Sequence, residues 1–151
     1  MTKREKLCYI AGVCDGESSL YISKTKKNNK NQYRACISIA MNDVFSLRVI
    51  QDMWGGNINV GTKKVDLETK KVYSPAYVLS YGSESKVKQI IKDLYPYLQV
   101  KKEQAQLIYM FLLHKEDVRI GKVSKFVGGG IMNNLYIKCK KLKSKNWIIK
   151  K

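Results

Sequence analysis

The stretch YIAGVCDGESS, residues 9–19, determines how the rest of the chain is interpreted. Its apolar run contains two adjacent small residues, Ala11 and Gly12, and ends in two carboxylates, Asp15 and Glu17. Glycine inside a helix costs about 1 kcal/mol relative to alanine, so this one indicates close approach of a second helix. We predict a helix over residues 7–14 that stops at position 16, with a carboxylate at its tip suited to a divalent metal. Taken alone, the pattern equally fits an amphipathic helix that ends in solvated acids.

Composition favours a single basic domain. The chain has 151 residues, 29 of them Lys or Arg and 12 Asp or Glu, for a net charge of +17. So large a charge opposes compaction unless a polyanion neutralises it, which makes nucleic acid the leading partner. No stretch is long and apolar enough to span a bilayer, and the basic residues run through the whole chain. We therefore expect no membrane partner.

The cysteines and the single histidine limit the available chemistry. The four cysteines form no CxxC pair and no zinc spacing, so we interpret them as small buried hydrophobes. This usage is typical of an intracellular, reducing compartment, either the cytoplasm or an organelle. His114 lies in an apolar helical stretch, where a structural role is the expected one. Any enzyme chemistry must then run on carboxylates, lysines and a metal.

Two hairpins and several helices follow the opening helix. Residues 19–25 and 32–41 alternate apolar and polar side chains, which predicts two half-buried strands joined by a polar connection at 26–31. A helix capped by Asn42 or Asp43 runs to about position 54. Strands at 57–62 and 72–81 form the second hairpin, with Pro75 indicating an edge or a bulge. Helices are then predicted at 83–94, 101–113 and 131–142, with a glycine-containing basic loop at 119–130.

The predicted order gives an α+β fold. Four strands form an antiparallel or mixed sheet, with helices on one face and a polar, lysine-bearing face left open. A twisted ribbon of this kind fits the major groove of B-DNA, whose base edges carry a distinguishable pattern of donors and acceptors. A charged sheet face that is merely solvated is the alternative; the net charge favours groove binding.

Three segments in register resemble the LAGLIDADG homing endonucleases. IAGVCDGESS (10–19) resembles the motif that names the family, NDVFSLRVIQDMWGGNI (42–58) its second helix and following strand, and LYPYLQVKKEQAQLI (94–108) a later segment with a Pro–aromatic–Leu, Lys–Lys and Gln–Ala pattern. The resemblance covers roughly residues 5–142. It implies an αββαββα core with a four-stranded saddle-shaped sheet and additional C-terminal helices. We expect one domain over residues 1–142 and a basic tail at 143–151.

The resemblance also implies a function. Family members make staggered double-strand breaks in long, nearly palindromic DNA sites by Mg²⁺-dependent phosphodiester hydrolysis, and they serve intron homing; other divalent metals can replace Mg²⁺. Only one motif copy is present here, so the chain is expected to act as a homodimer through the motif helix. Ala11 and Gly12 then become the expected subunit contact. A non-cleaving DNA- or RNA-binding protein of the same fold, an intron maturase or a repressor, is the alternative.

Site residues are assigned by position in the motif. The resemblance implies that Glu17 binds the metal through its carboxylate and Gly16 through its backbone carbonyl. Asp15 has a structural role at the helix end. Lys101 corresponds to the basic residue that polarises water around the scissile phosphate.

Two positions depart from the family pattern. Met41 stands where many members place a water-positioning glutamine, and Asn42 beside it is our candidate substitute. Ser18 replaces the last glycine of the motif. We expect the serine to shift the turn. Met41 favours the non-cleaving alternative, whereas Glu17 and Lys101 favour the enzyme.

The alternation in the hairpins predicts which side chains face the DNA groove. The candidates are Tyr21, Ser23, Thr25, Lys27, Gln32, Arg34, Ser38, Asn57 and Asn59.

Two other motifs carry less weight. The Glu68–Lys70 triplet, typical of restriction-type nucleases, lies in a charged connection without a suitable upstream acid. Gly128–Gly130 lacks the Lys-Ser/Thr that a phosphate-binding loop needs.

Overall fold

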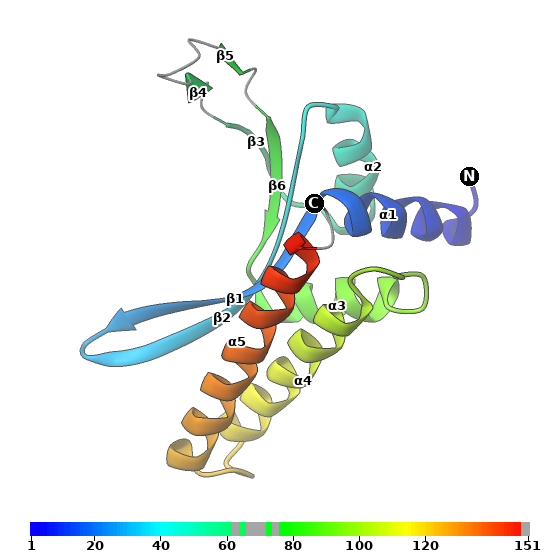
Figure 1. Ribbon diagram of the computed structural model, residues 1–151. Coiled ribbons are helices and arrows are strands. Elements are labelled where there is room, and N and C mark those ends of the chain that lie inside the picture. The colour runs from blue at the N-terminus through cyan, green and yellow to red at the C-terminus, as the bar shows by residue number, and fades with distance from the viewer. Residues whose placement is uncertain (62–63, 66–71, 74–75, 149–151) are drawn as a thin grey trace.

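The computed structural model describes residues 1–61, 64–65, 72–73 and 76–148 of the chain, and Figure 1 shows their arrangement. The helices are α1 (Lys3–Glu17), α2 (Val44–Trp54), α3 (Glu84–Leu94), α4 (Lys102–Arg119) and α5 (Lys125–Ile148). The strands are β1 (Ser18–Lys27), β2 (Lys30–Met41), β3 (Ile58–Val60), β4 (Lys64–Val65), β5 (Val72–Tyr73) and β6 (Tyr77–Tyr81). This order confirms the predicted αββαββα core with additional C-terminal helices.

One four-stranded sheet organises the fold. Its strand order is β1-β2-β6-β3, and each neighbouring pair is antiparallel. The β1–β2 hairpin and the β3–β6 pair splay away from each other, so the sheet curves into a saddle. The helices cover one face of this saddle and leave the other face open (Figure 1). The short β4–β5 pair forms a separate ribbon beyond β3 and β6.

The first hairpin confirms the predicted alternation. The core-facing side chains of β1 and β2 are almost fully buried: Leu20, Ile22, Tyr33, Ala35, Ile37 and Ile39. The connection is shorter than the predicted one at 26–31, because only Asn28 and Asn29 lie outside the strands. Both have positive φ, 49° and 58°. Two consecutive residues of this kind form the hairpin turn whose twist matches the flanking strands, and asparagine tolerates that backbone better than most residues.

The second hairpin is more interrupted than predicted. The strand expected at 57–62 is β3, and the return strand expected at 72–81 is divided into β5 and β6. Pro75, predicted to mark an edge or a bulge, lies outside the described residues. The glycine pair before β3 fits tightly: a Cβ on Gly56 would lie 3.0 Å from Leu79 Cδ1 and 3.1 Å from Tyr81 Cε1, and its φ is +102°. The chain therefore needs glycine there to pass over β6.

Helix α1 packs one stripe of side chains into the core. Leu7, Ile10, Ala11 and Cys14 are buried at helical spacing. A capping box formed by Thr2 and Glu5 begins the helix, four residues earlier than predicted. No helix in the described part of the chain is long and apolar enough to cross a membrane.

The C-terminal helix corrects the prediction of a loop at 119–130. In the structure α4 continues to Arg119 and α5 already begins at Lys125, so the three glycines are helical. Gly128 is buried where α5 crosses α4, and a Cβ built on it would overlap Cγ2 of Val118. Close packing of the two helices thus requires glycine at a position that propensity alone assigns to a loop.

Replacing Gly128 with alanine should destabilise the protein by about 1–3 kcal/mol, because the added methyl forces α4 and α5 apart. The matched control is Gly130→Ala, which meets nothing within 4 Å. It should leave stability unchanged or raise it by up to about 1 kcal/mol through helix propensity. Chemical denaturation of the two variants measures the difference. Equal stabilities would contradict the proposed helix contact, whereas rescue of Gly128→Ala by Val118→Ala would support it.

Candidate active site

Glu17 lies at the C-terminal tip of α1. It is the last residue of that helix, it is exposed, and it directly precedes the pairing of Ser18 with Ile39 at the start of β1. Its carboxylate has no hydrogen bond or ion pair with any residue that the structure describes. A negative charge at a helix C-terminus faces the negative end of the helix dipole, so the Glu17 charge slightly destabilises the helix. Such a carboxylate is available to an external cation.

Asp15, by contrast, is committed to the fold. Its carboxylate accepts hydrogen bonds from the backbone N–H of Gln99, at 2.8 Å, and of Lys101, at 2.9 Å. These bonds attach the end of α1 to the chain just before α4. The structural role that the family resemblance assigned to Asp15 is consistent with these contacts.

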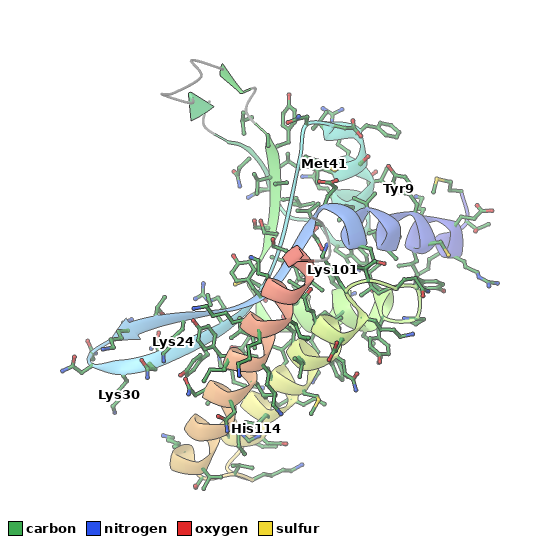
Figure 2. The ribbon with its side chains drawn as sticks, viewed as in Figure 1. Tyr9, Lys24, Lys30, Met41, Lys101 and His114 are labelled. Carbon is green, nitrogen blue, oxygen red and sulfur yellow. The ribbon has the colours of Figure 1, made fainter. Side chains whose placement is uncertain are left out.

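Lys101 completes an exchange of hydrogen bonds with the end of α1. Its Nζ donates to the backbone carbonyls of Cys14 and Asp15, both at 2.7 Å. Figure 2 labels Lys101. Carbonyls in the last turn of a helix have no intrahelical partner, and a cation beside them also offsets the helix dipole. Ser18 contributes too, since its hydroxyl donates to the carbonyl of Cys14 at 2.6 Å. The backbone that carries Gly16 and Glu17 is therefore fixed from two sides.

The structure separates the roles of the two small residues on α1. Ala11 is 1% exposed and packs within the core of this chain, which corrects the expectation that it contacts a second chain. Gly12 is exposed, and a Cβ placed on it would meet nothing within 4 Å. The helix also does not stop at Gly16 as predicted, because it continues through that residue to Glu17.

Met41 and Asn42 lie at the same end of the β1–β2 ladder as Glu17. Met41 is the last residue of β2, two positions beyond the Ser18–Ile39 pair, and it is partly buried against the core. Asn42 follows it and is exposed. The helix cap that the sequence left open between Asn42 and Asp43 belongs to Asp43, whose carboxylate accepts from the backbone N–H of Phe45 and Ser46. Asn42 thus remains outside the cap.

The predicted groove-facing side chains lie on the open face of the sheet. Register places Tyr21 opposite Cys36, Ser23 opposite Arg34, Thr25 opposite Gln32 and Lys27 opposite Lys30. Ser38 lies opposite Ser80 with their hydroxyls 3.1 Å apart, and Asn59 lies opposite Val78. Asn57 immediately precedes β3 and is exposed, as is Asn59. A groove of about 510 Å³ at the edge of β2 is lined in part by Ser23, Thr25, Gln32 and Arg34.

Some residues of this face were missed by the sequence reasoning. Lys30 and Ser80 belong to it because of their pairing partners, and the predicted alternation of β2 could have found the first of them. Lys143, assigned to a tail, lies on α5 with its Nζ 5.4 Å from the centre of the Tyr21 ring. A basic side chain of the last helix thus borders the open face, which no local sequence signal indicated.

Cysteine chemistry is not available at the site. Cys14 precedes Asp15 in the sequence and is buried, and desolvation raises the pKa of its thiol to about 12. It is a protonated thiol at neutral pH and hence a poor nucleophile.

The site offers oxygen donors suited to Mg²⁺. Glu17 supplies a carboxylate, and the carbonyl of Gly16 belongs to the same helix end, while the neighbouring carbonyls are engaged by Lys101. Hard divalent cations prefer such oxygen ligands. Among the described residues, no three histidine, cysteine, aspartate or glutamate side chains gather into a metal-binding cluster.

Several solved structures of known proteins share this architecture. The homing endonuclease I-CvuI, in complex with the I-CreI target, superposes with a TM-score of 0.73 and 18% identity over 92% of this chain and 82% of that one. The chain has the LAGLIDADG homing-endonuclease fold. An archaeal intron-encoded homing endonuclease, I-Vdi141I bound to DNA, gives a TM-score of 0.71 and 18% identity over 93% of this chain and 86% of that one.

Longer proteins share the LAGLIDADG fold as well. I-GzeII, a LAGLIDADG homing endonuclease in complex with its DNA target, gives a TM-score of 0.63 and 18% identity over 88% of this chain but only 43% of that one. No family model matches the chain, and no curated protein matches it by sequence. At these identities the comparisons show a shared fold.

Proposed function

We propose that the protein is a site-specific DNA endonuclease that acts as a homodimer on a long, nearly palindromic duplex and leaves a staggered break. The observation that carries this proposal is the exposed Glu17 carboxylate at the end of α1, which has no partner among the described residues. The Asp15–Lys101 exchange holds it beside an open saddle that bears lysine, arginine and neutral polar side chains. The structures of similar fold include proteins described as homing endonucleases bound to DNA, which supports the same substrate here.

The reaction would be hydrolysis of one phosphodiester on each strand. Glu17 and the Gly16 carbonyl would hold Mg²⁺, and Lys101 would keep their backbone in place. When bound, the metal supplies charge stabilisation at the phosphate and a readily deprotonated water. I-CvuI structures are described with Mg in one case and with Ca in another, which supports a divalent metal in this fold.

Two features support a homodimer. The chain spans most of I-CvuI and I-Vdi141I but less than half of I-GzeII, so two copies correspond in length to the longer protein. In addition, Cys8, Gly12 and Gly16 are exposed at four-residue spacing along α1. A stripe of small side chains lets two helix backbones approach closely. Paired through this stripe, two chains would place two Glu17 carboxylates near each other.

Gly12→Leu should convert the protein to monomers and abolish double-strand cleavage. Gly12 is exposed and a Cβ placed on it meets nothing within 4 Å in the isolated chain, so the fold should remain intact or gain helix propensity. Light scattering after size-exclusion chromatography reports the mass. Gly129→Leu, at another helical glycine with nothing within 4 Å, is the matched control and should remain dimeric. A dimeric Gly12→Leu protein would exclude this interface.

A random-sequence library of duplexes tests the proposed activity on whatever target the protein prefers. Duplexes are selected from the library with the wild-type protein in Ca²⁺, cloned into a plasmid, and incubated with the protein in Mg²⁺. The proposal predicts linear product with 3′ overhangs at the selected sequence. Failure to select any sequence, or binding without any strand break, would contradict it.

Met41 favours a second candidate, a non-cleaving binder of DNA or RNA such as a maturase or repressor. The thioether at the end of β2 offers no strong hydrogen bond to water at the place where many family members carry glutamine. Asn42, exposed beside it, is the side chain that would replace that function in an enzyme. Selected DNA that stays intact in Mg²⁺ would identify the protein as this binder.

A further inference from the structure

The outer half of the β1–β2 hairpin extends beyond the sheet. β2 pairs with β6 only from Ile37 to Met41, whereas its pairing with β1 continues to Lys30. Residues 22–35 therefore form a two-stranded ribbon, and such a ribbon has little stability of its own. Five of the proposed DNA-contacting side chains lie on it: Ser23, Thr25, Lys27, Gln32 and Arg34.

Side chains of α5 hold this ribbon from its helix side. The Tyr33 hydroxyl donates to Asn133 Oδ1 at 2.8 Å, and Lys24 Nζ lies 3.4 Å from the same oxygen. Lys24 Nζ is also 5.6 Å from the centre of the Tyr33 ring and 5.7 Å from that of Tyr136. The two rings pack with their centroids 5.8 Å apart. One amide, one cation and two aromatic rings thus join β1 and β2 to α5.

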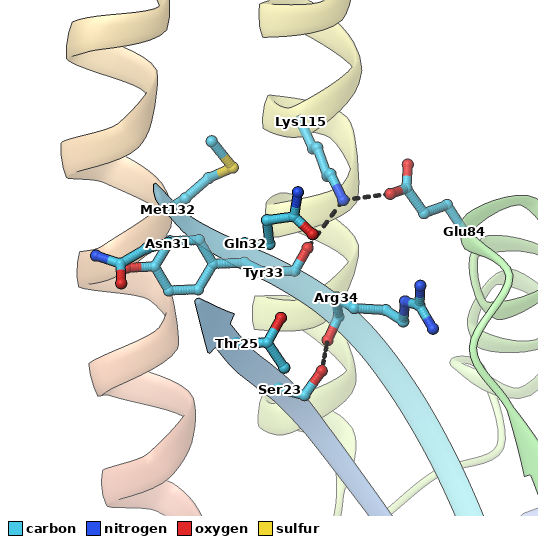
Figure 3. A pocket seen from close by; sticks show the side chains of 9 residues that line it. All are labelled: Ser23, Thr25, Asn31, Gln32, Tyr33, Arg34, Glu84, Lys115 and Met132. Carbon is cyan, nitrogen blue, oxygen red and sulfur yellow. Dashed lines mark hydrogen bonds and ion pairs between the residues drawn. The ribbon is translucent and has the colours of Figure 1, made fainter. Parts of the chain in front are cut away.

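A second attachment comes from α4. Lys115 Nζ donates to the backbone carbonyl of Tyr33 at 2.9 Å and pairs with the carboxylate of Glu84 at the start of α3 (Figure 3). The carbonyl lies on the side of β2 that has no strand partner at this point, because β6 ends opposite Ile37. Tyr33 is therefore held by its side chain from α5 and by its backbone from α4.

We propose that Asn133, together with Lys24 and Tyr136, sets the angle of the outer hairpin and thereby determines base discrimination at the outer positions of each DNA half-site. The inference rests on the proposed function. Register places Lys24 opposite Tyr33 on the helix-facing side of the hairpin. These residues therefore act as positioning residues: they orient the proposed DNA-contacting side chains of Thr25, Gln32 and their neighbours. Loss of the attachment leaves the inner part of the saddle, which β6 supports, in place.

The first test needs no DNA. In Asn133→Ala, amide hydrogen exchange in residues 23–34 should become about fivefold faster, the size expected for losing one shared hydrogen-bond acceptor. Exchange in α1 and α2 should not change. Asn134→Ala, the exposed neighbour on α5, is the matched control and should behave as wild type. Unchanged exchange across residues 23–34 in Asn133→Ala would overturn the attachment itself.

The second test measures specificity. Wild type, Asn133→Ala and Asn134→Ala each select from a random duplex library in Ca²⁺, and base preference is scored by distance from the centre of the site. Discrimination by Asn133→Ala should fall about tenfold at outer positions and stay unchanged at inner ones. A uniform loss of affinity, or no loss, would overturn the specificity role. If wild type selects no sequence, the proposed function fails instead, and the exchange result still decides the attachment.

Discussion

Glu17→Gln is expected to lower DNA cleavage by at least about a thousandfold and to leave DNA binding in Ca²⁺ nearly unchanged. The amide keeps the size of the side chain but removes the charge that would hold the metal at the end of α1. Since Glu17 has no partner among the residues that the structure describes, the substitution breaks no contact of the fold, and the loss of activity would not result from unfolding. Plasmid linearisation in Mg²⁺ measures the effect.

The same substitution should also leave folding stability unchanged or raise it slightly. Removing a negative charge from the negative end of a helix dipole contributes about 0.5 kcal/mol in favour of the folded state. Asp52→Asn, at an exposed position on α2, is the matched control and should cut at the wild-type rate. A Glu17→Gln protein that is inactive because it is unfolded, or one that cuts as well as wild type, would contradict the assignment.

Lys101→Met should reduce cleavage by about a hundredfold while the protein remains folded and dimeric. Its Nζ donates to the carbonyls of Cys14 and Asp15, and without it these groups lose a charged donor and the backbone before Glu17 loses its anchor.

Asp15→Ala should lower the free energy of unfolding by about 1–2 kcal/mol, because two backbone N–H groups lose their acceptor. Both variants should reduce cleavage by way of the same helix end.

A double-mutant cycle tests whether Asp15 and Lys101 support the end of α1 together or independently. Because Asp15 and Lys101 bond to each other's backbone, the double variant should be less impaired than the sum of the single variants predicts. Gln99→Ala is the control, since Gln99 contributes only its backbone N–H to Asp15 and should behave as wild type. Additive effects on cleavage in the double variant would contradict a shared role.

Local pattern predicted much of the fold. The first hairpin followed from strict alternation, since Leu20, Ile22 and Ala35 had to share one buried face. Helix α3 followed from an apolar stripe, with Val87, Ile90 and Ile91 buried as their spacing requires. These elements have periods that can be recognised within a dozen residues, so their prediction did not depend on tertiary contacts.

The rest depended on contacts between distant segments. The glycines at 128–130 favour a loop by propensity, yet α5 includes them because Gly128 fits against Val118 on α4. Ala11 and Gly12 are neighbours in sequence but point to the core and to solvent respectively, and only the packing of α1 distinguishes them. Tertiary packing decided both positions.

The candidate site was predictable in its residue types and less so in its contacts. Asp15 and Lys101 are 86 residues apart, and comparison with the family placed both near the site. It assigned Lys101 to the water around the phosphate, whereas in the structure its Nζ bonds to the end of α1. The support of the hairpin by Asn133 had no signal at all, because a single asparagine on a helix matches no motif.

Mixed dimers test the central claim, that each of two subunits supplies one Glu17. Wild-type and Glu17→Gln chains carrying different affinity tags are produced together, purified through both tags, and incubated in Mg²⁺ with a supercoiled plasmid that bears the selected site. The account predicts nicked circular plasmid from the mixed dimer, linear plasmid from wild type and neither from the Glu17→Gln homodimer. Linear product from the mixed dimer or from the Glu17→Gln homodimer at the wild-type rate would contradict it.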